Sequence, residues 1–358
     1  MKIAIYSPYL DTFGGGERYI LTIAEYLSYK HQVDLLFDAH LQAIGPEAMQ
    51  EKLMSFLSLD LSKINIIQAP LGRGSNILER SLFLRQYDLF FYVTDGSIFY
   101  STAKNNYIHF QVPFQNSSTS IWGKIKLSSW KEAIFNSTFT KEIVQKSWKI
   151  NGRVIYPPID VESFLPAPKT KVILSVGRFF DFLHSKKQEV LVETFIKMVK
   201  GGLKGWTLVL AGGTNQAGQE YIKKIKQKAT GFPVEFYCDV SFKKLKKLYG
   251  EASIYWHGAG FGESDPKKME HFGMTTVEAM AAGCVPVVIN KGGLVETVEH
   301  DKSGYLWETE DQLIDYTTKL INNKLLMSKF SQNAHARSKL FSKDKFCQRI
   351  ERLINENS

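Results

Sequence analysis

Short apolar runs alternate with stretches of helical periodicity along the whole chain. The apolar runs of the first half predict strands at 2–7, 32–38, 64–67, 89–93, 106–110 and 132–136. A glycine loop at 14–16 follows the first run, and a helical pattern continues from Glu17 to about Tyr29. A strand, a loop, a helix and a second strand in this order open a parallel α/β domain. The first half is therefore predicted to be a doubly wound, Rossmann-like domain.

The same pattern restarts after a proline-rich segment, 154–166, which we interpret as an interdomain linker. The second half predicts strands at 171–178, 206–213, 234–238, 253–258 and 284–289, an edge strand at 304–308, and helices at 186–199 and 242–252. From Asp311 the pattern is helical almost to the end. We expect a first domain at 1–158 and a second at 159–339, with the final helix, about 340–358, a candidate to pack back on the first.

Composition agrees with two ordinary globular domains. The chain has 358 residues, of which 44% are hydrophobic and 23% charged. No apolar run approaches the roughly 20 residues of a membrane span, and the N-terminus lacks signal-peptide features, so we expect a cytoplasmic protein. Three widely spaced cysteines, Cys238, Cys284 and Cys347, are typical of reduced core thiols and not of disulfides or a metal cluster.

The net charge of +9 is unevenly divided, with +2 in residues 1–160 and +7 in residues 161–358. A positive field favours anionic partners, such as nucleotide phosphates, anionic lipid or nucleic acid, without choosing among them.

The most informative stretch for chemistry is 267–288. A helix is predicted to begin near Met274 and to end at Gly283, before an apolar strand. The first turn of a helix has unpaired amides and the positive end of the macrodipole, so residues 273–276 are a candidate phosphate cradle. Gly273, which lacks a side chain, lets a ligand approach the backbone. Glu278 is placed to bind a ribose beside that phosphate, and Glu270 to reach the other side of the same pocket.

Four motifs in a fixed order carry a family resemblance. They are Gly-Gly-Gly-Glu-Arg-Tyr at 14–19, Ser-Val-Gly-Arg at 175–178 before a lysine-led helix, His-Gly-Ala-Gly-Phe-Gly at 257–262, and two glutamates eight positions apart that run into Glu-Ala-Met-Ala-Ala-Gly at 278–283. Together they resemble family 4 of the retaining glycosyltransferases. The resemblance implies the GT-B fold, in which two Rossmann-like domains face each other across a cleft and the second binds the nucleotide-sugar.

The resemblance also implies roles for individual residues. Arg178 and Lys186 match the cations that clamp the donor diphosphate in that family, with Lys187 as the alternative for the second. Gly14 and Gly15 match the glycines that approach the donor phosphates, although a tight turn would explain them equally well. His109 matches a histidine that faces the transferred sugar.

Further roles in the donor pocket follow from the same resemblance. The backbone of Phe272, Gly273, Met274, Thr275 and Thr276 is expected to line the pocket, with Glu278 on the nucleotide. Glu270 is expected to bind sugar hydroxyls and not to act as a nucleophile. Glu263 competes with it, because the segment before the first glutamate is longer than in the compact form of the motif.

The implied reaction transfers a hexose with retention at the anomeric carbon. No metal-ligand spacing is visible in the sequence, so we expect no metal and no cofactor beyond a GDP- or UDP-linked sugar donor. The Glu-His-Phe-Gly segment at 270–273 resembles that of mannosyltransferase members of the family, which implies mannose as the transferred sugar. The acceptor is expected to be a glycan or a lipid-linked glycan. Residues 122–135 and 145–153 mix tryptophan with lysine, which leaves peripheral contact with the inner face of a membrane open.

Two other classes of protein remain as alternatives. A dinucleotide-dependent oxidoreductase is suggested by the glycine loop and Asp38, but Tyr19 stands where the third glycine of that fingerprint belongs. A non-enzymatic nucleic-acid or membrane-binding protein is suggested by the lysine-rich helix at 242–252. Its apolar stripe makes those lysines the solvated face of a core helix, and we expect no nucleic-acid partner.

Overall fold

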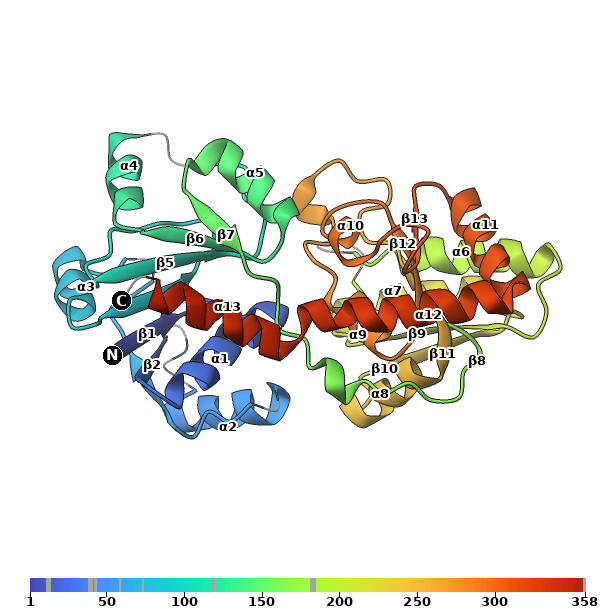
Figure 1. Ribbon diagram of the computed structural model, residues 1–358, viewed down its shortest axis with the longest axis horizontal. Coiled ribbons are helices and arrows are strands. Elements are labelled where there is room, and N and C mark those ends of the chain that lie inside the picture. The colour runs from blue at the N-terminus through green and yellow to red at the C-terminus, as the bar shows by residue number, and fades with distance from the viewer. Residues whose placement is uncertain are drawn as a thin grey trace. The chain divides into compact units, whose positions relative to one another are not determined.

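The computed structural model describes residues 1–10, 14–37, 41, 44–57, 59–72, 74–116, 120–180 and 185–356. The chain folds into two compact units (Figure 1). Unit 1 consists of Met1–Pro158 together with Asp344–Ser358, and unit 2 of Ile159–Lys343. Within the described residues, no helix combines the length and the apolar character needed to cross a membrane.

Unit 1 is a parallel sheet with helices on both faces. Its strands are β1 (Lys2–Tyr6), β2 (Gln32–Phe37), β3 (Ile64–Gln68), β4 (Leu89–Val93), β5 (Asn105–Phe110), β6 (Glu132–Phe135) and β7 (Gly152–Val154). Its helices are α1 (Gly15–Ser28), α2 (Pro46–Leu57), α3 (Ile77–Leu84), α4 (Ile121–Ser128), α5 (Thr138–Trp148) and α13 (Lys343–Asn355). The strand order is β3-β2-β1-β4-β5-β6-β7, so the direction of winding reverses between β1 and β4.

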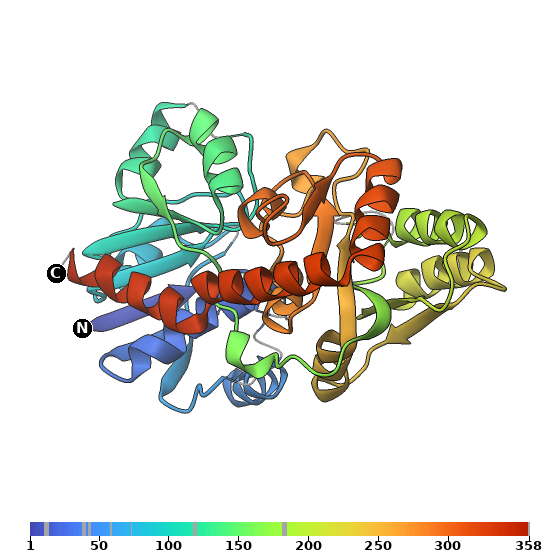
Figure 2. The same ribbon diagram turned by 45° about the vertical axis from the view of Figure 1, so that its right-hand side comes forward.

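Unit 2 repeats this plan. Its strands are β8 (Thr170–Val176), β9 (Thr207–Gly212), β10 (Val234–Cys238), β11 (Ala252–His257), β12 (Val285–Ile289) and β13 (Tyr305–Trp307). Its helices are α6 (Gln188–Lys200), α7 (Gln216–Lys228), α8 (Phe242–Glu251), α9 (Met274–Ala281), α10 (Leu294–Thr297), α11 (Glu310–Asn322) and α12 (Lys324–Ser338). The strand order is β10-β9-β8-β11-β12-β13, with all pairs parallel and β13 at the edge, as predicted. Helices α6, α7 and α11 pack together, as do α8, α9 and α12 (Figure 2).

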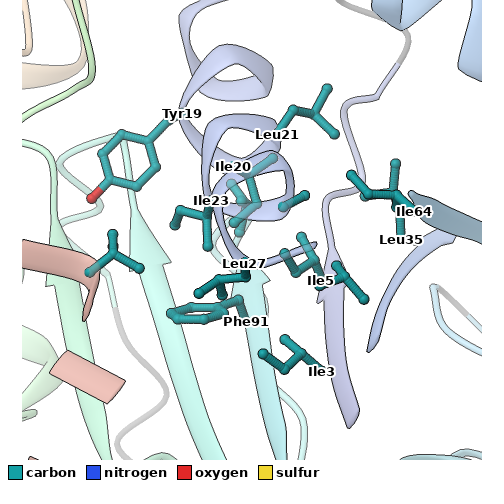
Figure 3. Close-up of a cluster of buried hydrophobic side chains, with 14 of the residues drawn as sticks. Ile3, Ile5, Tyr19, Ile20, Leu21, Ile23, Leu27, Leu35, Ile64 and Phe91 are labelled. Carbon is teal, nitrogen blue, oxygen red and sulfur yellow. The ribbon is translucent and has the colours of Figure 1, made fainter. Parts of the chain in front are cut away.

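The core of unit 1 shows why its elements form. Ile5 of β1 pairs in register with Leu35 and has Phe91 of β4 on its other side. Strands β1, β2 and β4 and the inner face of α1 contribute to one buried cluster, which Figure 3 shows. Helix α1 begins at a cap, because the Gly14 amide donates a hydrogen bond to Oε2 of Glu17, at 2.6 Å. Helix α13 adds further buried side chains to the same cluster: Phe346, Cys347, Ile350, Leu353 and Ile354.

Several predicted boundaries differ from the structure for local reasons. The helix predicted from residue 186 begins at Gln188, because Lys187 takes a left-handed conformation (φ 56°) at its cap. Strand β7 was not predicted, since its three residues are too few for a pattern. The helical region after Asp311 is three α-helices, of which α11 and α12 meet at Asn323 and α13 begins at Lys343. Asp38 lies outside the described residues.

The cysteines are free thiols in the described chain, with Cys284 and Cys347 buried and Cys238 half-buried. The predicted core position is therefore correct for Cys284 and Cys347, whereas Cys238 is less buried than predicted.

Candidate functional site

The candidate site lies in unit 2, where strands β8 and β11 end side by side at the reversal of winding. Ligands of open parallel sheets bind at such a point, beyond the carboxyl ends of the strands. Gly177 follows β8, and a Cβ atom on it would lie only 2.6 Å from Cγ of Lys186. A Cβ on Gly212, at the end of β9, would lie 2.1 Å from the Gly177 carbonyl oxygen. Glycine at these two positions therefore lets the β8 end, its neighbouring strand and Lys186 pack closely together.

Three side chains meet beside Gly177. The ammonium Nζ of Lys186 lies 2.6 Å from Oε2 of Glu270, and Nε2 of His257 lies 3.2 Å from the same oxygen. The lysine and glutamate side chains are about four-fifths buried, with exposed fractions of 22% and 17%, and His257 is fully buried. Lys186 precedes α6, His257 ends β11 and Glu270 lies in the loop before α9, so three separate segments build this cluster.

The protonation states follow from the surroundings of each group. Burial by itself raises the pKa of Glu270, but the charge of Lys186 and the contact with His257 more than offset it and hold that pKa well below its usual value. Burial lowers the pKa of His257, with Glu270 opposing the shift only in part. Nδ1 of His257 accepts a hydrogen bond from the Ala259 amide at 3.3 Å. The neutral imidazole therefore carries its proton on Nε2, towards Glu270, in a contact that is close but outside regular hydrogen-bond geometry.

Helix α9 begins directly after Glu270, His271 and Phe272, as the sequence predicts. Gly273 takes a left-handed conformation (φ 94°), and its carbonyl oxygen accepts hydrogen bonds from the amides of Thr276 and Val277. The preceding amides of the first turn point along the helix axis with the positive end of the macrodipole, which makes this end suited to an anion. The other end closes as predicted at Gly283 (φ 76°), with the Gly283 and Cys284 amides bonded back to the last turn.

Two tyrosines tie α9 to the rest of the site. The hydroxyl of Tyr255, on β11, donates to Oγ1 of Thr275 at 2.8 Å and also lies 3.3 Å from the Val176 carbonyl oxygen at the end of β8. The buried hydroxyl of Tyr249 donates to Oε2 of Glu278 at 2.8 Å. Burial, with a further contribution from the Glu278 charge, raises the pKa of Tyr249 well above its usual value, so this hydroxyl stays a donor.

The other predicted pocket residues contribute differently. The side chains of Phe272 and Thr276 are buried, and the Phe272 ring packs edge-on against Phe341 at 5.4 Å. Neither side chain is therefore exposed to a ligand, and the Thr276 amide is already bonded to the Gly273 carbonyl oxygen. Met274 is half-buried. Arg178 is exposed, and its guanidinium lies over the Phe180 ring at 5.3 Å, while its described contacts do not include Lys186 or Glu270.

The two alternatives considered for the lysine and the glutamate pair with each other. Nζ of Lys187 lies 2.6 Å from Oε1 of Glu263, in parallel with the Lys186–Glu270 pair. Glu263 is also approached by Lys268, at 3.6 Å, and its carbonyl oxygen accepts a hydrogen bond from Lys291. Lys187 and Glu263 therefore form a separate basic cluster, and Lys186 is the lysine that contacts Glu270.

The remaining predicted residues lie in unit 1. Gly14 and Gly15 are the cap and first residue of α1, at the carboxyl end of β1. His109, on β5, is buried and stacked on Tyr19 with ring centroids 4.0 Å apart. Burial lowers the pKa of His109 to about 3, so its imidazole is neutral at physiological pH. The roles predicted for these three residues stay predictions.

Sequence reasoning missed the glycine pair that supports Glu270. A Cβ on Gly292, which has φ 63°, would lie 2.2 Å from the Glu270 carbonyl oxygen, and the Gly293 amide donates to that oxygen at 2.8 Å. The available signal was two adjacent glycines that begin three positions after the end of a buried strand. His257, considered only a weak candidate from the sequence, and Tyr255 were missed as supports because nothing local in the sequence reveals what they contact.

The fold and the site define a class of protein. Two Rossmann-like units, one of which gathers a lysine, a glutamate and a helix N-terminus at its winding reversal, are typical of enzymes that bind nucleotides. Residues 158–337, half of the chain, match the family Glycosyl transferases group 1, and the chain belongs to this family. It is therefore a glycosyltransferase, and the alternatives of an oxidoreductase or a non-enzymatic binding protein are set aside.

Curated relatives and solved structures resemble the chain to different extents. It is 31% identical over 196 residues to the GDP-Man:Man(3)GlcNAc(2)-PP-Dol alpha-1,2-mannosyltransferase of Xenopus laevis, covering 49% of this chain and 38% of that protein. It is 25% identical over 253 residues to the human alpha-1,3/1,6-mannosyltransferase ALG2, covering 62% and 58%. The chain thus spans about half the length of these curated relatives.

The likeness to solved structures concerns the fold. A glycosyltransferase from Rickettsia africae ESF-5 superposes with a TM-score of 0.76 at 18% identity, covering 100% of this chain and 99% of that one. Anabaena Alr3699/HepE in complex with UDP superposes with a TM-score of 0.75, also at 18% identity, covering 99% and 100%. The predicted α/β fold with two Rossmann-like domains of the GT-B type is confirmed.

Proposed function

We propose that this protein transfers a mannosyl group from GDP-mannose to a lipid-linked glycan, with retention at the anomeric carbon and without a metal ion, as a member of family 4 of the retaining glycosyltransferases. The names of the mannosyltransferase relatives support the donor and the acceptor. The acceptor would place the reaction at the cytoplasmic face of a membrane. A UDP-linked donor is the alternative.

The observation that carries the proposal is the arrangement of Lys186, Glu270 and the N-terminus of α9 around the end of β8. In the proposed reaction, the bond between the anomeric carbon and the donor phosphate oxygen breaks. The acceptor hydroxyl oxygen bonds to that carbon from the same face, and its proton passes to the departing phosphate. Negative charge therefore grows on the diphosphate in the transition state, where a fixed cation and oriented amides stabilise it most.

Each residue of the cluster then has a distinct task. Lys186 and the amides at 273–275 bind the diphosphate, and the exposed Arg178, two residues after the end of β8, is close enough in sequence to Gly177 to join them. These cations would supply the charge compensation that a metal ion supplies elsewhere. Glu270 binds hydroxyls of the transferred sugar. The described contacts of its carboxylate are made by Oε2, which leaves Oε1 for a sugar hydroxyl, while Glu278 binds the ribose.

The direct test incubates the purified protein with a panel of nucleotide-sugars and a lipid-linked glycan, and measures nucleotide release in the presence and absence of EDTA. We expect release from GDP-mannose that EDTA does not change, and an anomeric configuration in the product that matches the donor by NMR. Lys186→Met should reduce the rate by about 100-fold or more, since it removes one donor to the developing charge. Release from a different donor, or inversion in the product, would refute the corresponding part of the proposal.

Lys187→Met is the matched control. It removes an ammonium one residue away that forms an equally short ion pair, but with Glu263. We expect it to retain most of the activity. Equal losses in the two variants would show that the general positive field matters and not the position of Lys186.

A further inference from the structure

The exposed apolar side chains of the protein are concentrated on one part of unit 1. Seven of the fourteen large apolar side chains that are exposed in the described residues lie between positions 77 and 125. They are Ile77, Leu78 and Leu82 of α3, Tyr100 of the loop before β5, and Ile121, Trp122 and Ile125 of α4. We call these seven residues the α3–α4 surface. A concentration of exposed apolar side chains on one part of a protein is typical of a site of interaction with a partner or a membrane.

Helix α4 has the form of an interfacial helix. Ile121, Trp122 and Ile125 lie within an arc of about 100° on its surface, given about 100° of rotation per residue. Their exposed fractions are 75%, 73% and 43%. Lys124 and Lys126 are exposed and flank this stripe on its two sides, and the helix carries no acidic residue. A short apolar stripe bordered by lysines suits a helix that lies in the plane of a bilayer surface.

Helices α3 and α4 are held together by the loop between β4 and β5. Oγ1 of Thr102 donates to the Ser81 carbonyl oxygen of α3 at 2.5 Å, and the Ser101 amide donates to Oγ of Ser129 at the end of α4. Both helices also contribute to the same buried cluster, α3 through Leu84 and α4 through the partly buried Leu127. One loop and one buried cluster therefore join the two helices, which places their exposed apolar residues and Tyr100 on the same part of unit 1.

The charges around this surface favour an anionic partner. Residues 77–131 contain six basic and three acidic residues. Of the acidic ones, Asp88 is paired with Lys104 at 2.6 Å, and Asp95 accepts a hydrogen bond from the Ser97 amide. Those two carboxylates are thus compensated within the fold. Glu79 of α3 is exposed, while α4 has two exposed lysines and no acidic residue.

We propose that the α3–α4 surface docks on a bilayer that contains anionic phospholipid. Trp122, Ile121 and Ile125 enter the headgroup boundary, and Lys124 and Lys126 contact lipid phosphates. Of the tryptophan and lysine pattern of the sequence, this surface keeps only the part with Trp122, Lys124 and Lys126, because Trp130 and Trp148 of that pattern are buried in the core. Docking is independent of the donor and acceptor proposed above, since it uses none of their residues.

A spectroscopic test is available because Trp122 is the single exposed tryptophan of the six. The others, Trp130, Trp148, Trp206, Trp256 and Trp307, are all buried. Vesicles of phosphatidylcholine with about 30% phosphatidylglycerol should blue-shift part of the fluorescence, and brominated acyl chains should quench it. Vesicles of phosphatidylcholine alone should bind at least 10-fold more weakly, and added salt should weaken binding to the anionic vesicles.

Two variants at exposed positions separate docking from the general positive charge of the chain. We expect Trp122→Ser/Ile125→Ser to lower co-sedimentation with the anionic vesicles by 10-fold or more. Leu325→Ser is the matched control, because Leu325 is an apolar residue with an exposed fraction of 86% on α12 of unit 2. Absence of binding to anionic vesicles, or equal binding by the double variant and the control, would overturn the proposal. Nucleotide release without vesicles tests the reaction separately.

Discussion

The Lys186–Glu270 pair makes a quantitative prediction about stability, independent of catalysis. At 2.6 Å and an effective dielectric constant of about 20, the attraction of the two charges amounts to about 6 kcal/mol. Desolvation costs several kcal/mol for each largely buried ion, so the net contribution of the intact pair to folding is small. Removing a single partner is a different matter, because the remaining charge keeps its desolvation cost without compensation.

The two partners should respond unequally. Lys186→Met leaves Glu270 buried beside a neutral His257, and we expect a loss of about 2–3 kcal/mol in the free energy of unfolding. Glu270→Gln leaves an ammonium on a flexible stem that can turn towards water, and we expect a loss of about 1 kcal/mol. The double variant Lys186→Met/Glu270→Gln should be within about 1 kcal/mol of the wild type.

Urea unfolding followed by circular dichroism measures these differences, and its pH dependence tests their cause. In Lys186→Met, burial is no longer offset, so the pKa of Glu270 should rise above its unfolded value of about 4.3. The loss should therefore be small at and below about pH 4, where the carboxyl group of the variant is mostly protonated in both states, and should develop as the pH rises from the unfolded pKa through the folded pKa. In the wild type, Glu270 contributes stability above its unfolded pKa that is lost at lower pH. A loss in Lys186→Met that does not change between pH 4 and 7, or a double variant as unstable as the sum of the singles, would refute this reasoning.

Three further predictions concern the backbone of α9, the thiols and His109. Gly273→Ala and Gly283→Ala should each cost about 1–2 kcal/mol, since both force alanine into positive φ, but only Gly273→Ala should weaken donor binding by calorimetry. Equal losses of donor binding in the two variants would argue against a phosphate-binding role for residues 273–276. Burial raises the pKa of Cys284 to about 11, so alkylation at pH 8 followed by mass spectrometry should modify it more slowly than half-buried Cys238, by about 100-fold. The imidazole of His109 should show no titration between pH 5 and 8 by NMR, and a midpoint in that range would contradict its burial.

Much of the fold could be predicted from the sequence because its central strands are buried on both faces. Such strands appear as continuous apolar runs, and those at 89–93, 106–110 and 284–289 agree with β4, β5 and β12 within a residue or so. Helix ends were harder to predict from the sequence than strands. The start of α6 depends on the left-handed conformation of Lys187, and a lysine gives no local signal for that conformation.

The candidate site was predictable where its chemistry is local in the sequence. The helix start near Met274 and its glycine terminator follow from composition and spacing alone. The residues that hold the site in place are distant from it in the sequence. Tyr255 of β11 donates to Thr275, and Gly292, in the loop after β12, leaves room for the Glu270 carbonyl oxygen. Such contacts form only when distant segments pack together, so a single sequence does not reveal them. The roles of the site residues in binding and catalysis remain predictions.

Helix α13 has a consequence for the order in which the protein assembles during synthesis. Unit 2 is one continuous segment, whereas unit 1 includes α13, which follows the whole of unit 2 along the chain. A ribosome therefore releases every residue of unit 2 before it delivers the last five apolar side chains of the unit 1 core. Until then the nascent first unit exposes the apolar surface that α13 will cover. A chaperone that binds exposed apolar surface would therefore act mainly at this stage.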